Sequence, residues 1–229
     1  MYLGPKLYRG AASLHPTVSV GRCASDGARP GCAPAGSDAK FARAAISPNL
    51  SPFALKVETF LRMAGFQYVV DTSKPLGPKG KCPWITVNGV DVTDSELIIE
   101  HLLTLRPHAL PAYRALTPQQ HALGRVVQVA LDEHLVLAMA AHRFVVDGMR
   151  HLVPMMAPRY RRRYRLLRPL AALWATASFR SIGWDRDREE LVALMHRDLT
   201  ALADLLGDRP YLLGDEVTPY DAAVFGYES

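Results

Sequence analysis

The chain has 229 residues, of which 49% are apolar and 21% are charged, and its formal net charge is +5. This is a globular composition, and the length allows two small domains of roughly 100–150 residues each. The most apolar stretch, residues 123–146, is interrupted by charged and histidine residues. It therefore lacks the ~18–20 nearly uncharged residues of a membrane span. We expect a core helix there and no transmembrane segment.

The three cysteines, Cys23, Cys32 and Cys82, form neither an even-numbered disulfide framework nor a Cys-x-x-Cys pair. No His and Cys residues have the spacing of a zinc site. The cysteine pattern therefore favours a reducing, cytoplasmic compartment and predicts no metal site.

Residues 1–45 are rich in Gly, Ala, Pro and Ser, which is typical of a low-complexity or disordered leader. The alternative is an organellar transit peptide, because arginines are present and acidic residues are few. No amphipathic helix is visible in this segment, so the disordered leader is favoured. The segment has no basic region followed by an apolar run, so it does not have the pattern of a secretory signal.

The first clear helix signal begins at Ser51, which is a preferred N-cap residue and is followed by Pro52 at the first helical position. Gly65 provides the matching stop. Apolar residues recur between them with helical spacing: Phe53, Val57, Phe60, Leu61 and Ala64. The pattern predicts one amphipathic helix of about three to four turns.

The period then changes to that of strands. Residues 68–70 read as a short strand, and residues 84–93 form a hairpin pattern around Asn88-Gly89. Asn-Gly supplies the positive φ angles that a two-residue type I′ turn requires. Thr93 or Asp94 then caps a helix that ends before Pro107.

Beyond Pro107 the chain is predicted to be helical. Pro118 starts a helix that runs towards residue 146, and a second amphipathic stretch follows the basic run at 159–165. Arginines interleaved with tyrosines can bind nucleic acid or an anionic membrane surface. No known nucleic-acid recognition motif accompanies them. We therefore expect a solvated helix face and no nucleic-acid partner. A third helix is predicted over 189–206.

The last motif is Thr218-Pro219-Tyr220-Asp221. Thr-x-x-Asp is a variant of the capping box, in which the fourth side chain reaches back to the N-cap amide. Thr218 and Asp221 are therefore interpreted as structural residues that open a final helix.

Three runs together carry a family resemblance: Ser51-Pro52-Phe53, Cys82-Pro83-Trp84-Ile85 and Asp94-Ser95-Glu96. Over roughly residues 46–229 the chain resembles the glutathione transferase superfamily, most closely the branch of the failed axon connections proteins and the metaxins. The resemblance implies an α/β thioredoxin-like N-terminal domain over 46–107, followed by an all-α C-terminal domain over 115–229. Two departures are expected. The family's first strand is not visible just before residue 46, and the helical domain looks incomplete at its end.

The resemblance also implies site residues. Ser51 matches the position that contacts the glutathione sulfur, where a helix N-terminus stabilises a thiolate. Pro83 matches the family's cis-proline, whose backbone pairs with the cysteinyl part of glutathione. Cys82 beside it is either reactive or a small buried apolar residue. Asp94 and Ser95 match the pair that holds the γ-glutamyl end. For Ser51 and for Asp94-Ser95, ordinary helix capping is the open alternative.

The implied activity is conjugation of the glutathione thiolate to a small electrophile, with glutathione as co-substrate and no other cofactor. The alternative is a non-catalytic adaptor of this fold, like the metaxins, that engages a protein or membrane partner. Many relatives dimerise, so a homodimer is a further expectation.

Overall fold

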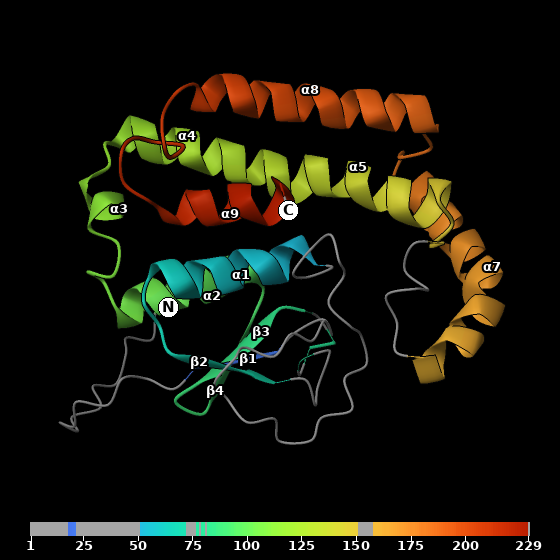
Figure 1. Ribbon diagram of the computed structural model, residues 1–229, viewed down its shortest axis with the longest axis horizontal. Coiled ribbons are helices and arrows are strands. Elements are labelled where there is room, and N and C mark those ends of the chain that lie inside the picture. Colours follow the sequence, from blue (N-terminus) through green and yellow to red (C-terminus); the bar gives the residue numbers. More distant parts are fainter. Residues whose placement is uncertain are drawn as a thin grey trace, which may run out of the picture.

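The computed structural model describes the following parts of the chain: residues 18–21, 51–71, 77, 79–80, 82–150 and 158–228. A small sheet with two helices on one face is followed by a larger helical layer (Figure 1). The first part consists of β1 (Val18–Gly21), α1 (Pro52–Met63), β2 (Tyr68–Asp71), β3 (Trp84–Val87), β4 (Val90–Thr93) and α2 (Ser95–Leu105). This is the predicted thioredoxin-like domain.

The helical part begins after residue 110. Its elements are α3 (Pro111–Ala115), α4 (Pro118–Val129), η1 (Ala130–Leu135), α5 (Val136–Ala141), η2 (His142–Val146), α7 (Pro158–Ser181), α8 (Arg188–Leu206) and α9 (Pro219–Glu228). The predicted order of an α/β domain and then an all-α domain is confirmed.

Strand β1 corrects the interpretation of the N-terminal segment. Residues 1–45 were expected to be a leader, and the first strand of the sheet was expected just before residue 46, if present. The structure has this strand at Val18–Gly21, in the order β2-β1-β3-β4. It is parallel to β2 and antiparallel to β3, with Val18 opposite both Tyr68 and Val87. The thioredoxin-like sheet therefore has its central strand, and the domain begins well before residue 46.

Helix α1 forms as predicted. The Ser51 hydroxyl accepts a hydrogen bond from the Ala54 amide at 3.4 Å, and Pro52 occupies the first turn. Gly65 follows the helix with a φ of 67°. The apolar side of α1 contributes Val57, Phe60 and Leu61 to the buried core that it shares with the sheet and α2. Phe53, at the start of the helix, is half-buried and packs against the core of the helical domain.

The predicted hairpin is also confirmed. Asn88 and Gly89 have φ angles of 52° and 78°, as a type I′ turn requires, and Trp84 pairs with Thr93. The Cys82–Pro83 peptide bond is cis, as the family resemblance implied. Asp94 then caps α2 with its side chain.

The predicted helix over 118–146 is one long rod in Figure 1, but α-helical and π-helical segments alternate along it as α4, η1, α5 and η2. A π-helical turn accommodates an extra residue and so rotates the faces of the helix that follows. A constant helical period therefore could not predict which side chains of 130–146 point inward.

Helix α9 lies along α1 and joins the two domains (Figure 1). A Cβ atom on Gly226 would lie 2.9 Å from the Pro52 carbonyl oxygen, so only glycine permits this approach. In the described parts of the chain no helix is both long and apolar enough to cross a membrane.

Candidate functional site

The predicted glutathione residues lie at one edge of the sheet because α1 and α2 run in the same direction. At the end of α2, Arg106 donates hydrogen bonds to the carbonyl oxygens of Ala64 and Gly65, at 3.3 Å and 3.0 Å. These carbonyls follow the end of α1. Since the C-terminal ends meet and the helices share a core, their N-terminal ends, at Ser51 and Asp94, lie towards the same edge.

The hairpin brings Pro83 to this edge. Trp84 pairs with Thr93 across the hairpin, so the residues just outside the pair, Pro83 and Asp94, are neighbours. Trp84 also pairs with Gly21, the last residue of β1. The end of β1, the start of β3 and the start of α2 thus converge.

Two helix N-termini give this edge a positive potential. The first amides of a helix have no partner inside the helix, and the helix dipole adds to their attraction for anions. Helices α1 and α2 have 12 and 11 residues. The edge is therefore suited to bind carboxylates and to stabilise a thiolate.

Asp94 caps α2 in a left-handed conformation, with φ at 82°. Its Oδ1 atom accepts hydrogen bonds from the amides of Glu96 at 2.9 Å and Leu97 at 3.3 Å. Ser95, the first residue of the helix, is buried. Asp94 therefore caps the helix, as the alternative interpretation of the sequence predicted. Its carboxylate is exposed, and these two bonds use only Oδ1 and not Oδ2.

Cys82 differs from both alternatives that the sequence left open. It is disulfide-bonded in the structure, so it is neither a reactive free thiol nor a free buried one. Pro83 beside it is buried.

No three His, Cys, Asp or Glu side chains gather as a potential metal site within the described ranges.

Comparisons with known proteins agree with this geometry. A profile of the glutathione S-transferase N-terminal domain matches residues 52–149, and one of the glutathione S-transferase C-terminal domain matches residues 195–228. The isoprene-epoxide glutathione S-transferase of Rhodococcus sp. strain AD45 is 32% identical over 189 residues, which cover 78% of this chain and 79% of that protein. This chain belongs to the glutathione S-transferase family.

Within the family, the chain also resembles Failed axon connections of Drosophila melanogaster, with 28% identity over 200 residues. The match covers 81% of this chain but only 47% of the Drosophila protein, so the chain spans about half of that relative. The predicted resemblance to the failed axon connections proteins is confirmed, whereas the resemblance to the metaxins stays a prediction.

Solved structures show the same fold. The β-etherase LigF from Sphingobium sp. strain SYK-6 superimposes with a TM-score of 0.56 at 16% identity, covering 93% of this chain and 82% of the other. Glutathione transferase Omega 3C from Trametes versicolor gives a TM-score of 0.50 at 16% identity, covering 94% and 72%. At this identity the likeness concerns the fold.

Sequence reasoning missed a buried polar cluster behind the first turn of α1. Lys56 donates to Asp132 at 2.6 Å, and the Tyr227 hydroxyl donates to the other oxygen of Asp132 at 2.9 Å. Burial and the nearby Asp132 carboxylate raise the pKa of Tyr227. The ring of Tyr227 also contacts Phe53 edge-on. The cluster joins the helix that begins at Ser51 to the helical domain, and spacings of 76 and 95 residues gave no local signal for it.

Asp221 has the predicted structural role. Its Oδ2 atom accepts from the Thr218 amide at 2.8 Å and the Thr218 hydroxyl at 2.7 Å, while Oδ1 accepts from the Leu212 amide at 2.7 Å. Asp221 therefore fixes both the start of α9 and the loop before it.

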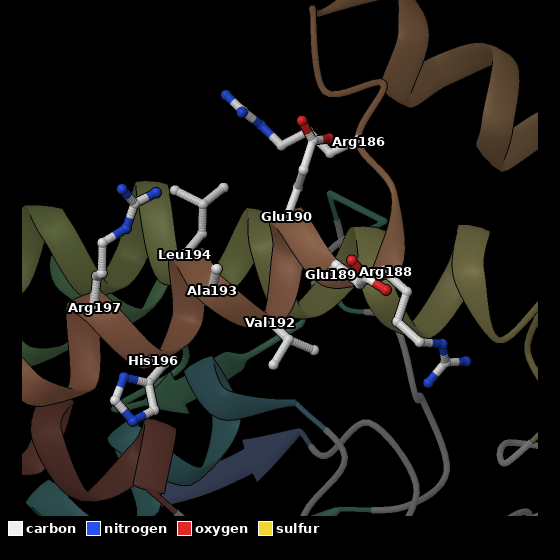
Figure 2. Close-up of a pocket in the computed structure, with 9 residues that line it drawn as sticks. All are labelled: Arg186, Arg188, Glu189, Glu190, Val192, Ala193, Leu194, His196 and Arg197. Atoms are coloured by element: carbon white, nitrogen blue, oxygen red, sulfur yellow. The ribbon is translucent and has the colours of Figure 1, made fainter.

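A basic hollow of about 840 Å³ lies along α8. Figure 2 shows that its side chains leave the helix in different directions: Leu194 and Arg197 point away from Val192 and His196. They do not converge on a common point. This hollow contains none of the predicted glutathione residues, and it does not form part of the candidate site.

Proposed function

We propose that this protein binds glutathione at the edge formed by the N-termini of α1 and α2 and transfers its thiolate to a small electrophile. The observation that carries the proposal is the parallel arrangement of these helices, which brings the N-termini of α1 and α2 to one edge beside Pro83. The γ-glutamyl carboxylate and the cysteinyl thiolate are both anions, and in this arrangement each lies at the positive end of a helix.

Each predicted residue has a separate task. The α-carboxylate of the γ-glutamyl group accepts from the amide and hydroxyl of Ser95, and its ammonium group pairs with Oδ2 of Asp94. The backbone before Pro83 pairs with the cysteinyl part. Ser51 donates its O–H to the sulfur, because a serine hydroxyl donates and accepts at the same time.

The reaction is a nucleophilic substitution. The glutathione thiol loses its proton to solvent, the thiolate forms a bond to an electrophilic carbon, and the bond from that carbon to its leaving atom breaks. With an epoxide, the substrate class named for the Rhodococcus relative, the ring C–O bond breaks and the oxygen takes up a proton. Glutathione is a co-substrate and no other cofactor is required. The cytoplasmic location expected from the cysteine pattern is not part of the proposal, because the disulfide at Cys82 is typical of an oxidising compartment. Homodimerisation is part of the proposal.

A non-catalytic binding module is the second candidate. It is favoured by the local hydrogen bonds of Ser51 and Asp94, both of which already cap the helices that they precede. In this case the fold is an adaptor for a protein or membrane partner, as the resemblance to the metaxins implied.

Thermal unfolding with and without millimolar S-methylglutathione separates the two functions. This thioether keeps the γ-glutamyl and glycyl ends of glutathione and cannot reduce the disulfide at Cys82. A ligand at ~100 times its dissociation constant adds about 2.7 kcal/mol to stability. We expect an upward shift that is smaller in Ser95→Ala and Asp94→Ala.

The matched control is Asp187→Ala, which removes the equivalent capping side chain from α8, far along the chain from the site. This variant should be less stable without ligand and should keep the full ligand-induced shift. If the wild-type transition does not move, or if all three variants shift equally, the glutathione site is wrong and the binding module is supported.

A further inference from the structure

Helix α7 contacts the rest of the described structure along one side. It packs mainly against the neighbouring η2 segment, and Phe179 also reaches the core cluster of Ala138, Ala141 and Leu191. On this side Ala175 is buried, and Arg168 donates a hydrogen bond to the carbonyl oxygen of Gly148 at 3.4 Å. Figure 1 shows α7 at the right-hand edge of the molecule, as the outermost helix there. Its other side therefore faces away from the helical domain.

That other side is apolar. We define the outer face of α7 as Leu166, Leu167, Leu170, Leu173 and Trp174, all of which are exposed. The exposed fraction reaches 81% at Leu166 and 72% at Trp174. Counted from Leu166, the others follow after one, four, seven and eight residues, which places all five within one apolar stripe of a helix. A contiguous apolar surface of this kind marks an interaction site, whereas a single exposed leucine does not.

The charge of α7 has one sign. Residues 158–181 include seven arginines and no aspartate or glutamate. Arg162, Arg163 and Arg165 are exposed in the first half of the helix. Guanidinium groups beside a leucine and tryptophan face are typical of helices that lie in the interface of a membrane, with the apolar side in the acyl region and the cations at the headgroups.

We propose that the outer face of α7 binds the surface of membranes that contain anionic lipids. The position at the edge of the molecule allows a flat surface to reach the whole helix. A second copy of the chain fits less well, because α7 offers no acidic side chain to pair with the arginines of its partner. Nucleic acid would use the arginines but would leave the five apolar side chains in water. The proposal is independent of glutathione binding.

The test is co-sedimentation of the full chain with vesicles of phosphatidylcholine, with and without about 30% phosphatidylserine. We expect binding to the anionic vesicles that weakens at least about tenfold in the double variant Leu170→Glu with Trp174→Glu. The matched control is Val126→Glu with Val192→Glu. It has the same change in charge, at exposed apolar sites on α4 and α8. This control should bind like the wild type, and circular dichroism should show all three proteins folded.

Tryptophan fluorescence locates the contact. Emission should shift to shorter wavelength on binding, and Trp174→Phe should bind equally well while losing that shift, since phenylalanine keeps the face apolar. The proposal is overturned if the wild type does not bind anionic vesicles, or if the control loses binding as the double variant does. A dimer that Leu170→Glu dissociates, without vesicle binding, would assign the face to a second copy. Binding to an RNA oligonucleotide that is tighter than to vesicles and unchanged in the double variant would assign α7 to nucleic acid.

Discussion

Lys56 and Asp132 form a buried ion pair across the boundary between the thioredoxin-like and helical domains. The Lys56 Nζ atom lies 2.6 Å from Oδ2 of Asp132, and the exposed fractions of the two side chains are 1% and 12%. Tyr227 donates to the remaining carboxylate oxygen. One carboxylate in η1 thus holds α1 and α9 together, immediately behind the helix start that carries Ser51.

Removing either charge should be strongly destabilising. We expect Lys56→Met to lower the free energy of unfolding by about 3–5 kcal/mol, because Asp132 is left as a buried charge without its cation. Urea denaturation measures the change. Asp185→Asn, in the exposed pair with Arg180, is the control and should cost at most about 1 kcal/mol.

The double variant Lys56→Met with Asp132→Leu should recover part of that loss, because it leaves no unpaired charge. A double variant that loses the sum of both single effects would show that the pair contributes through packing and not through charge.

The capping box of α9 should stabilise the fold more than the one of α8. Asp221→Ala removes three hydrogen bonds, among them the one to the Leu212 amide, so we expect a loss of about 2–4 kcal/mol. Asp187→Ala removes an exposed box at the start of α8 and should cost about 1 kcal/mol. Equal losses in urea denaturation would contradict the bridging role of Asp221.

The close contact between α9 and α1 also depends on Gly226, because glycine has no Cβ atom. A Cβ atom there would lie 2.9 Å from the Pro52 carbonyl and 3.2 Å from the Lys56 amide. We expect Gly226→Ala to destabilise the protein by about 1–3 kcal/mol, although alanine is the better helix former. Thr200→Ala, on the exposed side of α8, gains helix propensity without a clash and should be slightly stabilising. A stabilised Gly226→Ala variant would mean that α9 shifts away from α1 at no cost.

The sequence predicted the elements whose signals are local. The proline-led start of α1, the Asn-Gly hairpin and the capping box of α9 depend on a few adjacent residues, and all are present. The capping box of α8, formed by Asp187 and Glu190, was not predicted, although its residues are also adjacent. Strand β1 was missed because Val18–Gly21 is short, lies in a stretch rich in Gly, Ala, Pro and Ser, and takes all its partners from strands far along the chain. The same reason hid the pair of Lys56 and Asp132. In the site, the cis bond at Pro83 came from the family resemblance, whereas the disulfide at Cys82 was not foreseen.

Stability should fall steeply in alkaline solution. Burial and, next, the neighbouring Tyr113 raise the pKa of Tyr220 from 10.0 to about 12. Between about pH 10 and 12 the unfolded chain therefore binds fewer protons at this residue than the folded one, so the free energy of unfolding falls as pH rises. Tyr220→Phe should show a shallower decline in urea denaturation over this range. Because the pKa of Tyr227 is also raised, the free energy of unfolding of Tyr220→Phe should still fall with pH, but less steeply than in the wild type.

Tyr164→Phe, at an exposed position on α7, is the control for loss of a phenol and should keep the wild-type decline. A Tyr220→Phe variant with an unchanged slope would mean that this hydroxyl ionises in the folded protein as readily as in the unfolded chain.

Two measurements on Ser51→Ala distinguish the contribution of Ser51 as a helix cap from its contribution to stabilising the glutathione thiolate. The hydrogen bond from the Ala54 amide is long, at 3.4 Å, so loss of the cap should cost only about 0.5–1 kcal/mol in urea denaturation. If the hydroxyl also donates to the glutathione sulfur, the pKa of the bound thiol should rise in this variant, because a donor to the charged form is removed. Titration of the thiolate absorbance in the complex measures that pKa. A stability loss of the expected size with an unchanged thiol pKa would leave Ser51 as a helix cap alone and would assign thiolate stabilisation to the N-terminus of α1 as a whole.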